Sequence, residues 1–191
     1  MNKEIEAKFF IDNKEEIRKK LSSLNFNLIK KEFLMKRKTF DSEANGKWFR
    51  VRDEGDKITM TYKNIVDKSI NGVNEIEIIV DDFDKASEML NQTNFKERSY
   101  QENFREIWSN QDAEIVIDTW PFLQSYIEIE ALSEDIVKYY ANKLGFNFET
   151  EAYFGSVDIL YKQQYGISKK DFCRIKNITF NNNELKKIFN K

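Results

Sequence analysis

Charged and apolar side chains alternate in several short segments of the chain, and this alternation predicts a β-rich fold. In residues 4–9, two acids and a lysine alternate with Ile5, Ala7 and Phe9. Successive side chains of a strand point to opposite faces, so this segment has one charged and one apolar face. Further strands are predicted at residues 33–40, 48–53, 58–63, 75–80, 101–108, 114–118 and 126–131.

Apolar residues at helical spacing predict helices between these strands. Ile17 and Leu21 follow a capping sequence at Asn13, a second helix is expected over residues 82–92, and a third begins after Ser133. Shorter helices are expected at residues 155–165 and 184–189. Strands interleaved with helices of this kind predict an α+β fold.

Composition excludes several kinds of chemistry. The 191 residues contain no histidine and one cysteine, Cys173. Histidine-based triads, histidine metal sites, intrachain disulfides and cysteine zinc clusters are therefore excluded. Catalysis would have to use carboxylates, lysine, arginine, tyrosine and metal ions.

Charge and hydropathy argue against two classes of partner. Charged residues make up 34% of the chain, yet the net charge is only −2 and the pI about 5.5, which disfavours general nucleic-acid binding. The N-terminus does not resemble a signal peptide, and no apolar run is long enough to span a bilayer. We therefore expect a cytoplasmic protein with neither nucleic-acid nor membrane partners.

The charged strand faces allow two interpretations. They could be the solvated side of an antiparallel sheet, and for any single strand this is the more frequent situation. However, acidic pairs recur at alternate positions on three strands, where like charges repel unless a counter-ion is present. Divalent cations bind carboxylates, and arginine and lysine bind phosphate oxygens. The combined pattern therefore favours, by a small margin, a site for a metal-bound polyanion.

The order of these motifs resembles the CYTH family, also called triphosphate tunnel metalloenzymes. The resemblance rests on three strands above all: Glu4-x-Glu6-x-Lys8, then Phe49-Arg50-Val51-Arg52, then Thr61-Tyr62-Lys63. It continues, in the family's order, through Glu75-x-Glu77, Arg105, Asp118 and Glu128-x-Glu130. The ordered series is more specific than any one of its motifs.

The resemblance implies a fold and a domain division. The family fold is a closed eight-stranded antiparallel β-barrel, a tunnel with a charged lumen and helices packed outside. Residues 1–165 would form this domain, and residues 166–191 a C-terminal extension to which the sequence assigns no role.

The resemblance also implies a function and a role for each charged residue. Members act on small-molecule triphosphates with Mg²⁺ or Mn²⁺. Metal ligands would be Glu4, Glu6, Glu128 and Glu130; phosphate would be bound by Lys8, Arg50, Arg52, Lys63 and Arg105. Glu75, Glu77 and Asp118 would hold a second metal or orient water, and with Lys8, Arg52 and Lys63 they form the expected catalytic set.

Three functions remain open on the sequence alone. The first, and the one that we expect, is a phosphohydrolase that cleaves the terminal phosphate of inorganic triphosphate, thiamine triphosphate or a nucleotide. The second is an adenylate cyclase that makes cyclic AMP and pyrophosphate from ATP. The third is a non-catalytic binding module, favoured by Asn103, because family members often have a lysine there, two residues before the arginine. The oligomeric state is also open, with a homodimer among the alternatives.

Overall fold

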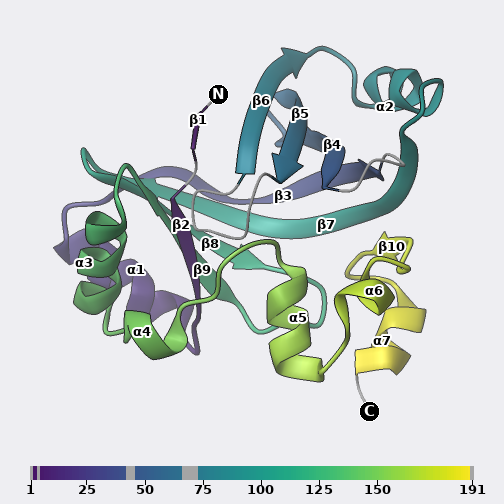
Figure 1. The fold of residues 1–191 in the computed structure, drawn as a ribbon. Coiled ribbons are helices and arrows are strands. Elements are labelled where there is room, and N and C mark those ends of the chain that lie inside the picture. Colours follow the sequence, from purple (N-terminus) through teal and green to yellow (C-terminus); the bar gives the residue numbers. More distant parts are fainter. Residues whose placement is uncertain (1, 4, 42–45, 66–72, 190–191) are drawn as a thin grey trace.

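The structure is a computed structural model that describes residues 2–3, 5–41, 46–65 and 73–189. It contains one large twisted β-sheet with helices grouped on its outer side (Figure 1). The strands are β1 (Asn2–Lys3), β2 (Glu6–Phe10), β3 (Asn27–Asp41), β4 (Lys47–Asp53), β5 (Ile58–Ile65), β6 (Val73–Val80), β7 (Lys96–Ser109), β8 (Ala113–Thr119), β9 (Tyr126–Ala131) and β10 (Asn177–Ile178). The helices are α1 (Lys14–Ser23), α2 (Phe83–Asn91), α3 (Glu134–Leu144), α4 (Phe148–Glu151), α5 (Asp158–Tyr165), α6 (Lys169–Phe172) and α7 (Asn183–Phe189).

Two long strands, β3 and β7, form the centre of the sheet. They pair antiparallel over most of their length, and shorter strands extend the sheet on either side (Figure 1). The order is β1-β6-β5-β4-β3-β7-β8-β9-β2, and β10 pairs with β7 beyond the point where β8 ends. The central pair therefore joins two groups of strands that are distant in sequence.

The prediction of a closed eight-stranded barrel is wrong. Within the described residues the sheet has ten strands, and its order begins at β1 and ends at β2 rather than returning to its start. The first predicted strand, residues 4–9, corresponds to β2, which pairs with β9, whereas β1 precedes it in the sequence and pairs with β6. β10 also departs from the expected arrangement, because it is parallel to β7. The α+β class itself is consistent with the structure.

The largest apolar core lies between three helices and the outer face of β2, β8 and β9. On β2, Ala7 and Phe9 are fully buried in this core, and Ile115 and Ile117 enter it from β8. Helix α1 begins where its sequence predicts, since the Asn13 side chain accepts hydrogen bonds from the backbone N–H groups of the next turn. Burial of the apolar face on this side directs the alternate, charged positions to the opposite side.

A second core covers the end of the sheet near β10. This core contains Trp120, which directly follows β8, and Tyr126 of β9, packed with Leu160 and Tyr161 of α5 and with Phe189 of α7. The helices after residue 157 gather beside β10 in Figure 1. The extension therefore packs against the same side chains as α5, and the boundary at residue 165 stays a prediction.

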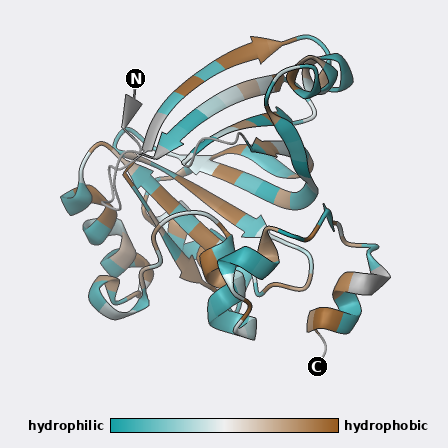
Figure 2. Ribbon diagram, turned by 45° about the vertical axis from the view of Figure 1, so that its right-hand side comes forward, coloured by the Kyte–Doolittle hydropathy of each residue, from teal (hydrophilic) through white to brown (hydrophobic). Residues whose placement is uncertain are grey.

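The alternation expected from the sequence is visible along the strands of Figure 2, where hydrophilic and hydrophobic residues follow one another. No helix in the described part of the chain is both long and apolar enough to cross a membrane.

Candidate functional site

The pairing register places charged residues of neighbouring strands side by side on the inner face of the sheet. Lys8 of β2 lies opposite Glu128 of β9, and Glu6 lies opposite Glu130. Directly opposed residues of antiparallel strands point to the same side of a sheet. The predicted acidic and basic positions are thus brought together by register as well as by alternation within each strand.

A first group of these residues forms close ion pairs, and we call it the paired cluster: Glu6, Lys8, Arg105, Asp118 and Glu128. The Lys8 ammonium lies 2.5 Å from Glu6 Oε1 and 2.9 Å from Glu128 Oε2. Burial opposes the charged form of Lys8, but Glu128 and Glu6 outweigh it and raise the pKa of Lys8 well above its usual value. Lys8 is therefore a firmly charged group held by two carboxylates.

Arg105 and Asp118 form the second pair of this cluster. Asp118 is fully buried and accepts two hydrogen bonds from Arg105, at 2.8 Å from Nε and 2.6 Å from Nη2. It also accepts from Asn103 Nδ2 and Tyr126 Oη, each at 3.1 Å. Despite burial, Asp118 raises the pKa of Arg105 well above its usual value. The Arg105 guanidinium is thus fixed by a bidentate contact.

A second group, the arginine cluster, consists of Arg37, Arg50 and Arg52 on β3 and β4. Arg37 lies directly opposite Arg52, and Arg50 lies one alternate position further along β4. The Nε atoms of all three are buried, and none of them has a hydrogen-bond partner among the described residues. Each guanidinium therefore has an unused donor in a region that is largely shielded from water.

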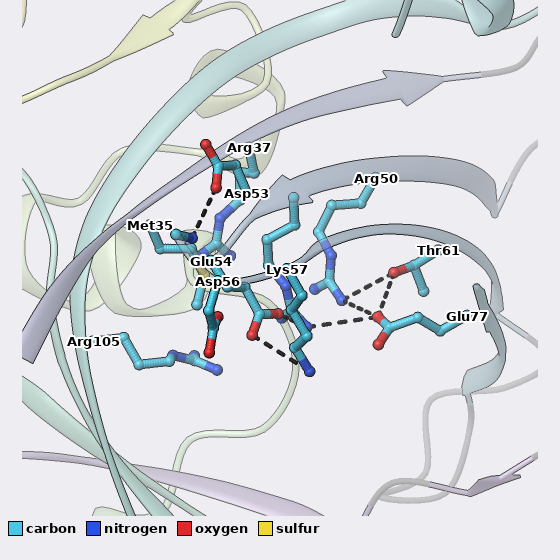
Figure 3. A network of polar contacts seen from close by, with 12 residues as sticks. Met35, Arg37, Arg50, Asp53, Glu54, Asp56, Lys57, Thr61, Glu77 and Arg105 are labelled. Atoms are coloured by element: carbon cyan, nitrogen blue, oxygen red, sulfur yellow. Dashed lines mark hydrogen bonds and ion pairs between the residues drawn. The ribbon is translucent and has the colours of Figure 1, made fainter. Parts of the chain in front are cut away.

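The partners of this cluster engage only the terminal nitrogens of the arginines. Arg50 Nη2 donates to Thr61 Oγ1 at 3.3 Å and lies 3.5 Å from Glu77 Oε2, contacts that Figure 3 marks. Arg52 Nη2 lies 2.7 Å from Glu54 Oε1 and 3.6 Å from Glu77 Oε2. Burial and the nearby Arg50 lower the pKa of Arg52 to about 10, although Glu54 opposes this. The positive charges are only partly compensated.

Three further predicted residues lie beside this cluster: Lys63 on β5, and Glu75 and Glu77 on β6. Lys63 Nζ lies 2.5 Å from Glu75 Oε2, and Glu75 is also 3.8 Å from Arg50 Nη2. Burial raises the pKa of Glu77, but the hydrogen bond from Thr61 and the nearby Arg52 and Arg50 lower it overall. Glu77 is therefore ionised and contributes negative charge beside Arg50 and Arg52.

Asn103 connects the two clusters. Its Oδ1 accepts a hydrogen bond from Arg37 Nη2, while its Nδ2 donates to Asp118. Arg105 also lowers the pKa of both Arg37 and Arg52 by charge repulsion, and Lys63 helps to lower that of Glu128. Groups of the two clusters are therefore within electrostatic range of one another.

The fit of a divalent metal rests on the donor chemistry. Glu6, Glu128 and Glu130 provide carboxylate oxygens on two paired strands, the donor type that Mg²⁺ and Mn²⁺ prefer. Lys8 and Arg105 lower the pKa of Glu128 despite its burial, so that carboxylate is ionised. Glu4 lies outside the described residues, and within those described no three acidic side chains are grouped closely enough to form a metal site. The donors fit in kind, and their assembly around a metal remains a prediction.

The sequence interpretation missed Arg37. Three consecutive cations, Lys36, Arg37 and Lys38, occupy β3, so their alternation alone does not identify the inner position. The sequence analysis gave Arg37 no role, whereas the register places it opposite Arg52 and Gln101 on the inner face. Glu54, which follows β4 and contacts Arg52, was also missed.

Comparisons with known proteins agree with the sequence motifs. A family sequence model described as the CYTH domain matches residues 2–151. A Methanocaldococcus jannaschii protein named "Putative adenylate cyclase MJ0240" is 31% identical over 138 residues, which cover 70% of this chain and 79% of that protein.

Solved structures share the fold. The PH1012 protein of Pyrococcus horikoshii OT3 has a TM-score of 0.71 at 24% identity, over 82% of this chain and 98% of that chain. A Hippeastrum protein described as having a dominant triphosphatase activity has a TM-score of 0.52 at 19% identity, over 90% and 95% of the two chains. The family-model match covers more than half of the chain, and the ordered motifs of the inner face lie within it. The chain therefore belongs to the CYTH domain family.

Proposed function

We propose that this protein is a metal-dependent triphosphatase that removes the terminal phosphate from inorganic triphosphate, thiamine triphosphate or a nucleotide. Family membership supports an enzyme acting on triphosphates. The choice of hydrolysis is our own proposal, in keeping with the activity described for the Hippeastrum protein.

One observation carries the proposal: three arginines meet on the inner face, and their Nε atoms are buried and have no hydrogen-bond partner among the described residues. Bringing like charges together without full compensation costs stability. A polyphosphate would offset that cost, because its oxygens accept charge-assisted hydrogen bonds and carry the opposite charge. A merely solvated sheet face would place such side chains in water rather than bury them.

We assign the remaining basic residues to the same anion. Lys8, Arg50, Arg52, Lys63 and Arg105 would hold phosphate oxygens and offset the charge that develops during phosphoryl transfer. Lys8 and Arg105 are already oriented by Glu128 and Asp118. Preorganised charges of this kind stabilise a transition state without the cost of reorganising at the moment of reaction.

The acidic residues divide into two proposed roles. Glu4, Glu6, Glu128 and Glu130 would hold Mg²⁺ or Mn²⁺, which when bound offsets phosphate charge as a Lewis acid. Glu75 and Glu77 remain candidates for orienting the attacking water. Asp118 instead accepts four hydrogen bonds, so we now assign it to positioning Arg105 rather than to a second metal.

Adenylate cyclisation is the second candidate, favoured by the name of the Methanocaldococcus jannaschii relative. The two reactions differ in the nucleophile. Water attacking the terminal phosphorus releases phosphate, whereas the ribose 3′-oxygen attacking the α-phosphorus releases pyrophosphate. The same cationic residues could stabilise either displacement.

The test is incubation with inorganic triphosphate, thiamine triphosphate and ATP, each with Mg²⁺ or Mn²⁺, followed by phosphorus NMR. Triphosphatase activity gives orthophosphate and is abolished by EDTA. Cyclic AMP with pyrophosphate from ATP would instead establish the cyclase. Binding of triphosphate without turnover of any substrate would leave only the binding module.

A further inference from the structure

Arg37 differs from the other arginines of the inner face in having no acidic partner. It is 8% exposed, and no carboxylate among the described residues lies within ion-pair distance of it. Its Nη2 donates to the amide oxygen of Asn103 and to Met35 Sδ, and its Nε has no partner in the described part of the chain. Its guanidinium also lies 4.7 Å from the centroid of the Trp120 ring.

The surroundings of Arg37 are strongly cationic. Burial, followed by Arg50, Arg105 and Arg52, lowers the pKa of Arg37 to about 9, with Asp118 opposing the shift. At neutral pH the side chain still carries its charge. Arg37 is therefore a buried cation surrounded by three others, an arrangement that costs folding free energy unless an anion is bound.

Asn103 provides the second part of the argument. This chain has an amide where the family resemblance leads us to expect a lysine, and that amide accepts a hydrogen bond from Arg37. A lysine at position 103 would place an ammonium against the Arg37 guanidinium. The neutral amide avoids this repulsion and fixes the Nη2 end of the guanidinium by accepting its hydrogen bond. The positive charge at this place on the inner face thus comes from β3 rather than from β7.

We propose that Arg37, held by Asn103 and flanked by Arg50 and Arg52, forms an additional phosphoryl-binding subsite in which its charge replaces that of the lysine absent from position 103. The occupant is one phosphoryl group of a polyphosphate. Its oxygens accept hydrogen bonds from the unused Nε–H groups of the three arginines. This inference rests on the proposed function for the identity of the anion.

The ring of Trp120 supports the position of this subsite. Trp120 is 3% exposed and belongs to the core formed with α5, α6 and α7, so the surface beneath Arg37 is a packed one. The cation lies against an aromatic ring on one side and the Asn103 amide on another. The guanidinium is thereby held between two neighbours of the fold, while its Nε remains without a partner in the described part of the chain.

The first test compares Arg37→Met with the wild type, because methionine keeps the apolar packing on Trp120 and removes the charge. Calorimetry with inorganic tripolyphosphate in EDTA should show affinity at least tenfold weaker, while the unliganded variant melts no lower than the wild type. A purely structural role for Arg37 predicts a lower melting temperature and unchanged affinity. Tripolyphosphate affinity within twofold of the wild type would overturn the inference.

The control is Arg18→Met on α1. Unlike Arg37, Arg18 contacts a buried acid, with Nη2 2.7 Å from Glu106 Oε2, and Glu106 packs on the helix-covered side of β7. This variant should melt at a lower temperature, because it leaves Glu106 without its cation, and should bind tripolyphosphate as the wild type does.

The second test relocates the charge. Asn103→Lys alone should lower the melting temperature, since it adds a cation beside Arg37. The double variant Arg37→Met with Asn103→Lys restores one charge to the subsite and should bind tripolyphosphate at least fivefold more tightly than Arg37→Met. If the double variant binds no better than Arg37→Met, the proposed replacement of one charge by the other is wrong.

These measurements separate the inference from the proposed function. Wild-type protein that binds tripolyphosphate without turning it over would contradict the triphosphatase and leave the subsite standing. Turnover of tripolyphosphate by the wild type, together with unchanged affinity in Arg37→Met, would support the triphosphatase and contradict the subsite. A wild type that neither binds nor hydrolyses tripolyphosphate would refute both.

Discussion

The two clusters of the inner face solve the problem of buried charge in opposite ways. In the paired cluster each cation has an acid at hydrogen-bond distance, as in the bidentate contact of Arg105 with Asp118. In the arginine cluster the acids reach only terminal nitrogens, and the Nε donors of Arg37, Arg50 and Arg52 are left over. The cations of the first cluster are already oriented by acids of the chain, whereas the arginines of the second have Nε donors left for a ligand.

This difference shows that charged residues on one sheet face can contribute in two ways. Some stabilise the fold through ion pairs, and others remain available to bind a ligand. Removing a member of a satisfied buried pair leaves its partner uncompensated and costs stability. Removing one of several crowded cations relieves repulsion, so the loss should appear in ligand binding instead. The two clusters should therefore respond differently to equivalent substitutions.

The largest effect is expected for Asp118→Ala in the paired cluster. It leaves Arg105 buried without its carboxylate, which should lower the free energy of unfolding by about 3–5 kcal/mol. Urea denaturation measures this loss. Asp56→Ala, which removes an exposed partner of Lys30, is the control and should change little. Equal stability of the two variants would contradict the structural role of Asp118.

Arg50→Met should reduce triphosphate turnover by roughly a hundredfold or more, because one charge-assisted contact to the transferring phosphate is lost. Its melting temperature should be no lower than that of the wild type, since Lys63 still pairs with Glu75, and Thr61 and Arg52 with Glu77. Additional metal should not restore the rate. Arg174→Met, on an exposed arginine of the C-terminal region, is the control and should keep full activity.

The contrast can be sharpened without any mutation, by adding the ligand. Tripolyphosphate at about one hundred times its dissociation constant should stabilise the folded protein by about 2.7 kcal/mol, or roughly 5–10 °C in melting temperature. Sulfate at equal ionic strength is the control for general salt effects. A melting temperature that responds equally to both anions would deny the arginine cluster any selectivity for polyphosphate.

The effect of Glu6→Gln should be smaller and of a different kind. If Glu6 holds metal, removing its charge should weaken Mg²⁺ affinity by roughly tenfold or more while leaving metal-free tripolyphosphate binding intact. Excess Mn²⁺ should recover part of the rate. Glu16→Gln, on the exposed side of α1, is the matched control. Loss of tripolyphosphate binding in EDTA would place Glu6 outside the metal site.

Most charged residues of the inner face could be predicted from the sequence, but Arg37 could not. Alternation in residues 126–131 placed Glu128 and Glu130 on one strand face, and the register sets them opposite Lys8 and Glu6. The inward orientation of Arg37 was not predicted, because Lys36 and Lys38 flank it and only cross-strand pairing shows which side chain faces inward. Alternation of residue types shows which side chains share a strand face. Where successive residues are all cationic there is no alternation, and the inward-facing residue cannot be identified.

Closure of the sheet could not be judged from the sequence either. Whether β2 meets β6 depends on contacts between strands some 65 residues apart, which no local alternation encodes. The chain instead places β1 on β6 and β2 on β9, so that two strands close together in the sequence lie at opposite ends of the sheet order. The alternation therefore predicts which strand faces are charged, but it does not predict which strands pair at the two ends of the sheet.

Calorimetric titration of the wild-type protein with tripolyphosphate in EDTA tests the central claim most directly. The arginine cluster is assembled from protein side chains alone, so it should bind one equivalent of tripolyphosphate without metal, with an affinity that falls as salt increases. Turnover should be absent under these conditions and should begin when Mg²⁺ or Mn²⁺ is added in excess of EDTA. Absence of binding at millimolar tripolyphosphate would contradict the account.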